Sequence, residues 1–414
     1  MPRSLLLLLL FASLFNMAPL TPAQEKKTPV TGLASTDLAS FDEMMLKFMA
    51  DNQVPGASLA VAKDGKVVYA RGFGHADQQL GLSVESDMRF RIASISKPIT
   101  AAMILRLIEL GLLNMDDNPF AVLKIALPAD ADPRLKKITI RQLLQHTAGW
   151  DRAKSFDPMF RPILIAKDQK VQPPAKPMDI IHYMTTQKLD FEPGERYAYS
   201  NFGYCILGRV IEKVSGQSYE SAVQKHVFDP LGVKQTLLGH TLTTAKKEVH
   251  YFDEKNRTAK AVLGPDLGKP VPLPYGAWYL EAMDSHGGWI STAPDLVRFA
   301  SAFDRPEKCK ILEAASIKTM FACPQGLAGH TADGKEKEVF YGCGWQVRTV
   351  GNGRINTWHN GALDGTATIL VRRADGLTWA VLFNTRANAK GTYLGGLIDP
   401  LVHQAANKVK HWPK

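Results

Sequence analysis

Cysteine is scarce in this sequence, with four residues among 414, and the eleven histidines are scattered. No Cys or His pair has the spacing of a zinc site, so the sequence indicates neither a metal nor another cofactor. The cysteines, Cys205, Cys309, Cys323 and Cys343, allow three disulfide pairings. We expect Cys205 to be a buried thiol, because it lies in an apolar helical pattern. Cys309 and Cys323 flank a short helix pattern and are the favoured pair.

Long hydrophobic runs are also missing after the first residues of the chain. Residues 1–23 combine Arg3, an apolar run from Leu5 to Phe15 and a Thr-Pro-Ala end, which is typical of a cleaved signal peptide. The run is too short to span a bilayer, and no Cys follows it to carry a lipid. We therefore expect a secreted or periplasmic protein without stable membrane insertion after cleavage. Residues 24–36 are predicted to form a polar linker.

Charge is unbalanced but not concentrated. The formal net charge is +10, and the Lys and Arg residues are dispersed along the chain. Such a surface suits anionic surroundings such as an envelope polymer, and its dispersal argues against nucleic acid binding. A hydrophobic content of 45% is sufficient for a large core, and no internal repeat is visible. We expect one domain from 37 to 410.

The order of the predicted elements indicates an α+β fold. A helix pattern from Leu38 to Met49 precedes two strand-like runs that meet at Lys63-Asp64-Gly65, which predicts a hairpin. Strand patterns return at 339–347, 365–372 and 377–384, and a helix is expected at 397–409. We therefore predict an antiparallel sheet built from both ends of the chain and flanked by helices. This α/β part would cover about 37–115 and 285–410, with a mostly helical region inserted at about 116–284.

The first candidate cluster opens a strongly apolar helix. Ser94 and Lys97 lie three residues apart, so they share one face at the start of the predicted helix. A neutral amine there can take the proton of the serine hydroxyl, and a charged amine can lower the pKa of another base. A Ser-x-x-Lys pair arises by chance in a chain of this length, as a helix cap with a solvated lysine. Its place on an apolar helix favours the catalytic interpretation.

The second cluster follows a Pro-Gly turn and leads into another helix. Tyr199 and Asn201 are predicted to lie on the loop that enters this helix, where reactive side chains are common. Beside Lys97, the pKa of Tyr199 would fall below its ordinary value of about 10, and a phenolate could act as the base for Ser94. Taken alone, each residue is better explained as a buried tyrosine bonded to backbone or as a helix-capping asparagine.

The third cluster is Trp358-His359-Asn360-Gly361-Ala362, which we expect just before the strand at 365–372. A glycine beside a strand often marks close approach of a ligand to the backbone. If this edge lines the site, the amides of Ala362 and Ser94 could form an oxyanion hole, and His359 could add a hydrogen bond or a positive charge. A single histidine near a strand is otherwise usually structural.

The three clusters together resemble a known family. Ser94-Ile95-Ser96-Lys97, Tyr199-Ser200-Asn201 and His359-Asn360-Gly361 follow the order of the three motifs of the serine β-lactamase and penicillin-binding-protein superfamily. The chain most resembles the class C branch, which includes DD-carboxypeptidases, D-aminopeptidases and esterases, over about 38–409. The resemblance implies a β-lactamase/transpeptidase-like fold. It also implies Ser94 as nucleophile, Lys97 and Tyr199 as proton-transfer partners, Asn201 as a ligand of Lys97 or substrate, and Ala362 as oxyanion donor.

Two departures from the family pattern bear on the substrate. The interval after Ser94 is long, and we expect residues 152–177 to form an insertion beside the site. β-Lactamases usually carry Lys-Thr-Gly in the third motif, whereas this chain has His359, which is mostly neutral at pH 7. We therefore expect a D-stereospecific peptidase of DD-carboxypeptidase type, acting on a small molecule or a peptide, for example one derived from peptidoglycan. The alternatives are a small-ester hydrolase, then a β-lactamase, and last a non-catalytic binding protein.

Overall fold

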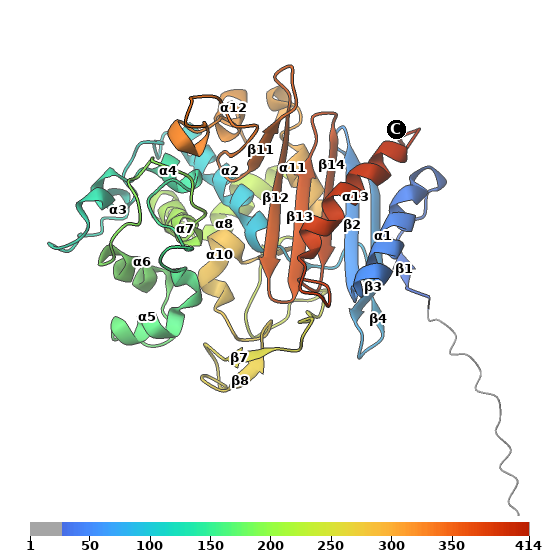
Figure 1. Ribbon diagram of the computed structural model, residues 1–414, viewed down its shortest axis with the longest axis horizontal. Helices are drawn as coiled ribbons and strands as arrows, with labels where there is room; N and C mark the ends of the chain where they lie inside the picture. Colours follow the sequence, from blue (N-terminus) through green and yellow to red (C-terminus); the bar gives the residue numbers. More distant parts are fainter. Residues whose placement is uncertain (1–26, 414) are drawn as a thin grey trace, which may run out of the picture.

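The computed structural model describes residues 27–413, and the predicted signal peptide lies outside this range. Its centre is a large antiparallel sheet with the strand order β1-β3-β2-β14-β13-β12-β11-β10, and β4 pairs with β3. Figure 1 shows the first strands of the chain, in blue, beside the last ones, in red. The sheet strands are β1 (Val30–Thr31), β2 (Gly56–Lys63), β3 (Lys66–Asp77), β4 (Leu82–Ser83), β10 (Val339–Tyr341), β11 (Gln346–Thr349), β12 (Ile355–Leu363), β13 (Thr366–Arg372) and β14 (Leu377–Phe383).

The two ends of the chain meet where β2 pairs with β14, with Ala57 opposite Phe383 and Lys63 opposite Leu377. Side chains on these strands alternate between the two faces, as the period of a strand requires. Leu59 and Val61 pack into the core under one face, whereas Ala60 and Ala62 pack into the core under the other. Both faces of the sheet are therefore buried, and the α+β prediction is confirmed.

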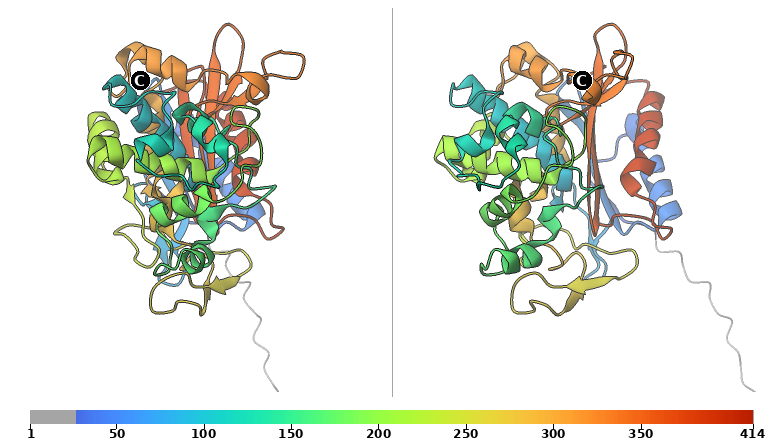
Figure 2. Two further views of the ribbon diagram at one scale, coloured as in Figure 1. Left: turned by 90° about the vertical axis from the view of Figure 1, so that its left-hand side faces the viewer. Right: turned by 60° about the vertical axis from the view of Figure 1, so that its left-hand side comes forward.

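Helices cover the two faces unequally. On one face lie α1 and α13 alone, and on the other lie α2, α11 and the helices between the two halves of the sheet, as Figure 2 shows. The helices are α1 (Ala39–Asn52), α2 (Ser96–Glu109), α3 (Pro119–Val122), α4 (Ile140–Leu144), α5 (Pro162–Asp168), α6 (Pro177–Thr185), α7 (Asn201–Ser215), α8 (Tyr219–Val223), α9 (Asp229–Leu231), α10 (Asp284–Gly287), α11 (Ala293–Ser301), α12 (Ala314–Met320) and α13 (Leu394–Lys408).

The region between the two halves of the sheet is not purely helical. A small sheet there joins β5 (Phe90–Arg91), β9 (Trp289–Ser291) and β6 (Leu237–Leu238), and a separate ribbon pairs β7 (Thr258–Lys260) with β8 (Pro270–Pro272). This ribbon lies at the lower edge of the molecule in Figure 1, in yellow. Within residues 27–413, no helix has both the length and the apolar character needed to cross a bilayer.

Three details of the sequence-based predictions are wrong. The run at 339–347 is a hairpin of β10 and β11 rather than one strand, because Gly342 to Gly344 reverse the chain between them. The third candidate cluster precedes β13 as expected, but it lies in a strand of its own, β12, which the sequence did not predict. All four cysteines are free thiols, including the favoured pair. The Sγ of Cys323 lies 3.3 Å from the carbonyl oxygen of Gly329 instead of bonding to Cys309.

Candidate active site

Ser94 stands in a tight turn that feeds directly into the most buried helix of the fold. The turn is a 3-10 helix, η2 (Ala93–Ile95), which runs into α2, and Ala93 adopts a left-handed φ of 46°. A left-handed conformation is costly for a residue with a Cβ, and such strain is typically held at functional positions by the surrounding structure. Ser94 lines a cleft of about 510 Å³ together with Tyr199, Asn201, His359 and Ala362. The structure thus brings the three candidate clusters together.

Lys97 lies one helical turn after Ser94 and is fully buried. Its Nζ lies 3.0 Å from Ser94 Oγ, 2.8 Å from Asn201 Oδ1 and 2.8 Å from the backbone oxygen of His286. Burial drives the pKa of Lys97 well below its ordinary value, with Arg152 adding to the effect and Asp157 opposing it. Burial therefore favours the neutral form of this amine.

The protonation state of Lys97 fixes the direction of its hydrogen bonds. A neutral amine has two N–H donors and one lone pair. The oxygens of Asn201 and His286 can only accept, so they take both N–H groups. In the neutral form, the Ser94 hydroxyl, whose oxygen lies 3.0 Å from Nζ, is the partner left for the lone pair of Lys97. This arrangement prepares Ser94 for loss of its proton.

Tyr199 differs from the phenolate that the sequence predicted. Its hydroxyl forms a hydrogen bond with Ser94, and its ring lies 4.8 Å from Lys97 Nζ. Burial nevertheless raises the pKa of Tyr199 well above its ordinary value, and the hydrogen bond with Ser94 opposes this only in part. The expected fall in the pKa of Tyr199 is therefore wrong, because burial favours the neutral phenol.

Asn201 begins α7, directly after Ser200, whose hydroxyl accepts from Gly203 N and caps the helix. While Asn201 Oδ1 accepts from Lys97, its Nδ2 donates to Asp157 Oδ2 over 2.6 Å. Burial raises the pKa of Asp157, although the hydrogen bond from Asn201 lowers it. Asp157 therefore fixes which end of the amide faces Lys97. Sequence reasoning missed this residue because it lies in the expected insertion, outside any motif.

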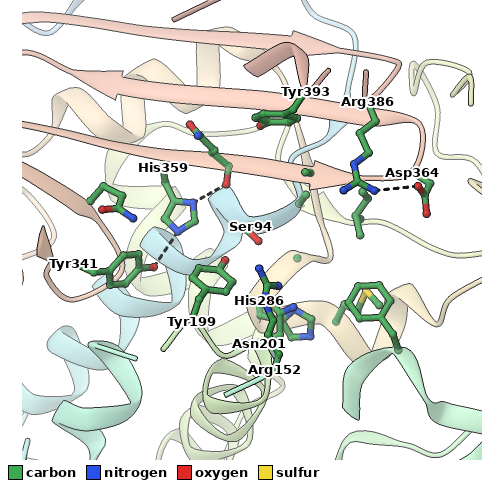
Figure 3. Close-up of a pocket in the computed structure, with 18 of the residues that line it drawn as sticks. Ser94, Arg152, Tyr199, Asn201, His286, Tyr341, His359, Asp364, Arg386 and Tyr393 are labelled. Atoms are coloured by element: carbon green, nitrogen blue, oxygen red, sulfur yellow. Dashed lines mark hydrogen bonds and ion pairs between the residues drawn. The ribbon is translucent and has the colours of Figure 1, made fainter. Parts of the chain in front are cut away.

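His359 does not supply the positive charge that the sequence allowed. Its Nδ1 lies 2.7 Å from the carbonyl oxygen of Asn360 and must donate, so its Nε2 accepts from the Tyr341 hydroxyl at 2.9 Å. Burial lowers the pKa of His359 to about 3, so the ring is neutral. Figure 3 shows His359, Tyr341 and Tyr199 grouped on one side of Ser94, with Arg386 and Asp364 on the other.

Gly361 is required for a contact within the chain rather than with a ligand. A Cβ at this position would lie 2.2 Å from the carbonyl oxygen of Ile92, two residues before Ser94. Thr368, on the neighbouring strand, donates its hydroxyl to the same oxygen over 3.1 Å. This contact accounts for the glycine without a ligand, and close ligand approach at Gly361 stays a prediction. The missing side chain lets β12 pack against the turn that carries Ser94.

Two arginines that the sequence motifs did not single out line the cleft. Arg152 lies over the ring of Tyr199, with 4.8 Å from its guanidinium carbon to the ring centroid. Arg386 lies 3.2 Å from Asp364, and its side chain is 46% exposed. A cation beside a nucleophile suits a substrate carboxylate. In the described part of the chain, no cluster of three His, Cys, Asp or Glu residues could hold a metal ion.

Comparison with known proteins identifies the family. The family model described as "Beta-lactamase" matches residues 41–400, which is most of the chain. The chain belongs to the beta-lactamase family. It is 29% identical over 359 residues to "Penicillin-binding protein 4" of Amycolatopsis lactamdurans, covering 84% of this chain and 85% of that protein. It is also 29% identical over 343 residues to "Penicillin-binding protein 4*" of Bacillus subtilis, covering 78% of this chain and 66% of that protein.

Solved structures share the fold of this beta-lactamase family member. The octameric penicillin-binding protein homologue from Pyrococcus abyssi matches with a TM-score of 0.66 and 25% identity, over 89% of this chain and 78% of that one. The D-amino acid amidase from Ochrobactrum anthropi matches with a TM-score of 0.69 and 20% identity, over 91% and 99%. The hydrolase EstCE1 matches with a TM-score of 0.67 and 22% identity, over 91% and 99%. The predicted β-lactamase/transpeptidase fold is confirmed, and the homologues include hydrolases of this family.

Proposed function

We propose that this protein is an exported serine hydrolase that works through an acyl-enzyme on Ser94. The observation that carries the proposal is the buried amine of Lys97, which lies 3.0 Å from Ser94 Oγ and also contacts the oxygens of Asn201 and His286. Burial favours the neutral amine, and its lone pair then has only the Ser94 hydroxyl to accept from. The export part of the proposal depends on the signal-peptide pattern of residues 1–23.

The reaction follows from these hydrogen bonds. Ser94 Oγ attacks the substrate carbonyl while its proton passes to Lys97, and the amides of Ser94 and Ala362 are the proposed donors to the oxyanion. When the tetrahedral intermediate collapses, the bond to the leaving amine or alcohol breaks. The leaving atom takes a proton from the Tyr199 phenol, and the phenolate regains one from the protonated amine of Lys97, which lies beside its ring. Water then attacks the ester in the same way and releases the acid, which restores Ser94.

The substrate we favour is a peptide of D-amino acids, cleaved in the manner of a DD-carboxypeptidase. Such a substrate ends in a carboxylate, and the half-exposed guanidinium of Arg386 in the cleft can pair with it. A β-lactam carboxylate would meet a neutral His359 in the third motif, which argues against efficient β-lactamase action. Hydrolysis of small esters needs no carboxylate partner and is the alternative.

A labelling experiment tests the nucleophile. A fluorescent fluorophosphonate is expected to label the wild-type protein and the control Ser96→Ala, but not Ser94→Ala. Ser96 is the matched control because its hydroxyl donates to the Ala93 oxygen over 2.7 Å and is not available for attack. Labelling of Ser94→Ala at the wild-type rate would assign the nucleophile to another residue.

A substrate panel then tests the substrate class. It compares a D-Ala-D-Ala peptide, p-nitrophenyl acetate and nitrocefin, each with wild-type protein and Arg386→Gln. We expect the peptide to be the best substrate. Loss of the guanidinium should raise its KM about tenfold or more, as for a charge-assisted hydrogen bond, and leave p-nitrophenyl acetate unaffected. Equal effects on both substrates, or turnover of the ester alone, would favour the ester hydrolase.

A further inference from the structure

A second hollow of about 400 Å³ lies beside the catalytic cleft. One wall is the segment of η4 (Pro158–Phe160) and α5, which belongs to the expected insertion, and the other is the chain around β7 and β8. Phe160 lines both this hollow and the catalytic cleft, so the two adjoin at this side chain. The hollow, here called the apolar groove, therefore extends the site that contains Ser94.

Exposed apolar side chains are concentrated in this groove. Among residues 27–413, twelve large apolar side chains are exposed, and four of them line this groove. Phe160 is 46% exposed, Leu164 53% and Leu267 43%, and Ile163 is the fourth. Neighbours on the same two segments, such as Ile165 and Val262, are buried in the ordinary way. Clustered exposed apolar side chains in a hollow mark a surface that binds an apolar partner.

Charge is confined to a few positions in the groove lining. Arg161 and Lys260 are its ionisable members, and no carboxylate lines it within the described part of the chain. The guanidinium carbon of Arg161 lies 4.4 Å from the centroid of the Phe156 ring, so one face of the guanidinium is already covered. The groove is thus apolar along its length. A hydrocarbon chain fits this lining better than a charged peptide segment does.

The geometry around Ser94 indicates which half of the substrate reaches the groove. The leaving atom takes its proton from Tyr199, whose ring packs against His146, at 4.3 Å between centroids, and Tyr341, at 6.3 Å. The rings of Tyr199 and Tyr341 form one wall of the cleft. On the other side of Ser94 the cleft remains open past Asn201 and Met283 toward Phe160. The acyl half, which stays on Ser94, is the half that can extend in this direction.

We propose that the apolar groove binds an apolar chain on the acyl half of the substrate, so that the substrate is an amphipathic acyl compound. This inference rests on the proposed Ser94 hydrolase and adds its substrate class. Leu164 and Leu267 belong to the two walls of the groove, and they determine the preference for acyl chain length.

A chain-length series tests this assignment. Initial rates with p-nitrophenyl esters from acetate to decanoate, below their micelle concentrations, give kcat/KM against acyl length. For the wild-type protein we expect kcat/KM to rise with each added methylene, by up to about fourfold per methylene, until the groove is filled. Leu164→Asp and Leu267→Asp should flatten the rise and keep the acetate rate. Leu112→Asp is the matched control, because Leu112 is 50% exposed outside the groove.

Binding without turnover provides an independent measurement. Ser94→Ala protein should bind dansylaminoundecanoic acid, observed as an increase in fluorescence, and Leu164→Asp in the same background should weaken this binding at least tenfold. Leu112→Asp should leave the affinity unchanged. Equal weakening by both substitutions would mean that the probe binds nonspecifically, and the proposal would fail.

The outcomes separate this proposal from the proposed function. Ester hydrolysis that persists in Ser94→Ala would refute the hydrolase mechanism itself. Acetate hydrolysis that depends on Ser94, without any rise in kcat/KM with acyl length, would refute the groove alone. A rise that follows the length of the alcohol in a series of alkyl acetates would also refute it. Two further results would refute it: a dimer in sedimentation that Leu164→Asp abolishes, or binding to neutral phospholipid vesicles that Leu164→Asp abolishes. A second copy of the chain or a lipid surface would then occupy the groove.

Discussion

Replacement of Gly361 by alanine tests how the sheet controls the nucleophile. An ideal Cβ there would lie 2.2 Å from Ile92 O and 2.3 Å from Thr368 Oγ1. Cβ contacts in proteins are essentially never below 3.0 Å, so β12 and the turn before Ser94 must separate by about 0.8 Å, the difference between 3.0 and 2.2 Å. The Thr368 hydroxyl cannot relieve the clash without loss of its hydrogen bond to Ile92 O.

The expected effect on catalysis follows from this displacement. Ile92 precedes Ser94 by two residues, and Ala362 follows Gly361, so the shift changes the spacing of both proposed oxyanion donors. A misplacement of about 1 Å costs roughly 100-fold in rate. Overpacking of a buried contact lowers the free energy of unfolding by about 1–3 kcal/mol. Gly361→Ala should therefore lose about 100-fold in kcat/KM and remain folded at 25 °C.

The assay combines the rate of fluorophosphonate labelling, kcat/KM for p-nitrophenyl acetate and thermal unfolding. Gly203→Ala is the matched control, because a Cβ on this α7 glycine would lie 3.6 Å from Leu143, an ordinary contact. Alanine is also a better helix former than glycine by about 1 kcal/mol, so the control should retain activity and unfold at the same or a higher temperature. Wild-type labelling and wild-type melting for Gly361→Ala would refute the reasoning.

Three further predictions concern protons and charge. Lys97→Met should lower kcat/KM by at least about 1000-fold with little change in folding, measured by ester turnover and circular dichroism, and a loss below tenfold would reduce Lys97 to a packing residue. The negative charge of Asp157 raises the pKa of Lys97, so this pKa should fall further in Asp157→Asn. The acidic limb of the pH profile of kcat/KM should then move to lower pH. An unchanged limb would mean that Asp157 is uncharged. His359 has a pKa of about 3 in the folded protein and about 6.5 in the unfolded chain. As the pH falls, the unfolded chain binds the proton before the folded protein does, so the free energy of unfolding decreases below pH 6.5. Between pH 7 and 4.5 His359 should contribute about 2 to 3 kcal/mol to this loss in urea denaturation. The buried His146 and His286 cause a loss of stability in both proteins, so the total loss should be smaller in His359→Gln by that amount, and equal losses in both proteins would contradict the prediction.

Local patterns in the sequence were sufficient for the elements and the motif residues. The hairpin of β2 and β3 follows from alternating residues around Asp64-Gly65, and the apolar run after Lys97 predicts α2. Three motifs in order predicted that Ser94, Tyr199 and His359 would meet in one cleft, and the structure has them there. These features depend on local spacing, which one chain displays directly.

The protonation states were decided only by the tertiary structure. Burial, not proximity of a cation, controls the pKa of Lys97, Tyr199 and His359, and burial is a property of the whole core. The role of Asp157 likewise depends on a fold that brings an insertion 44 residues before Asn201 within hydrogen-bond distance. The sequence determined which groups are present. Long-range packing decided their charge and the residues that line the cleft, because desolvation and cavity shape arise from contacts between residues distant along the chain.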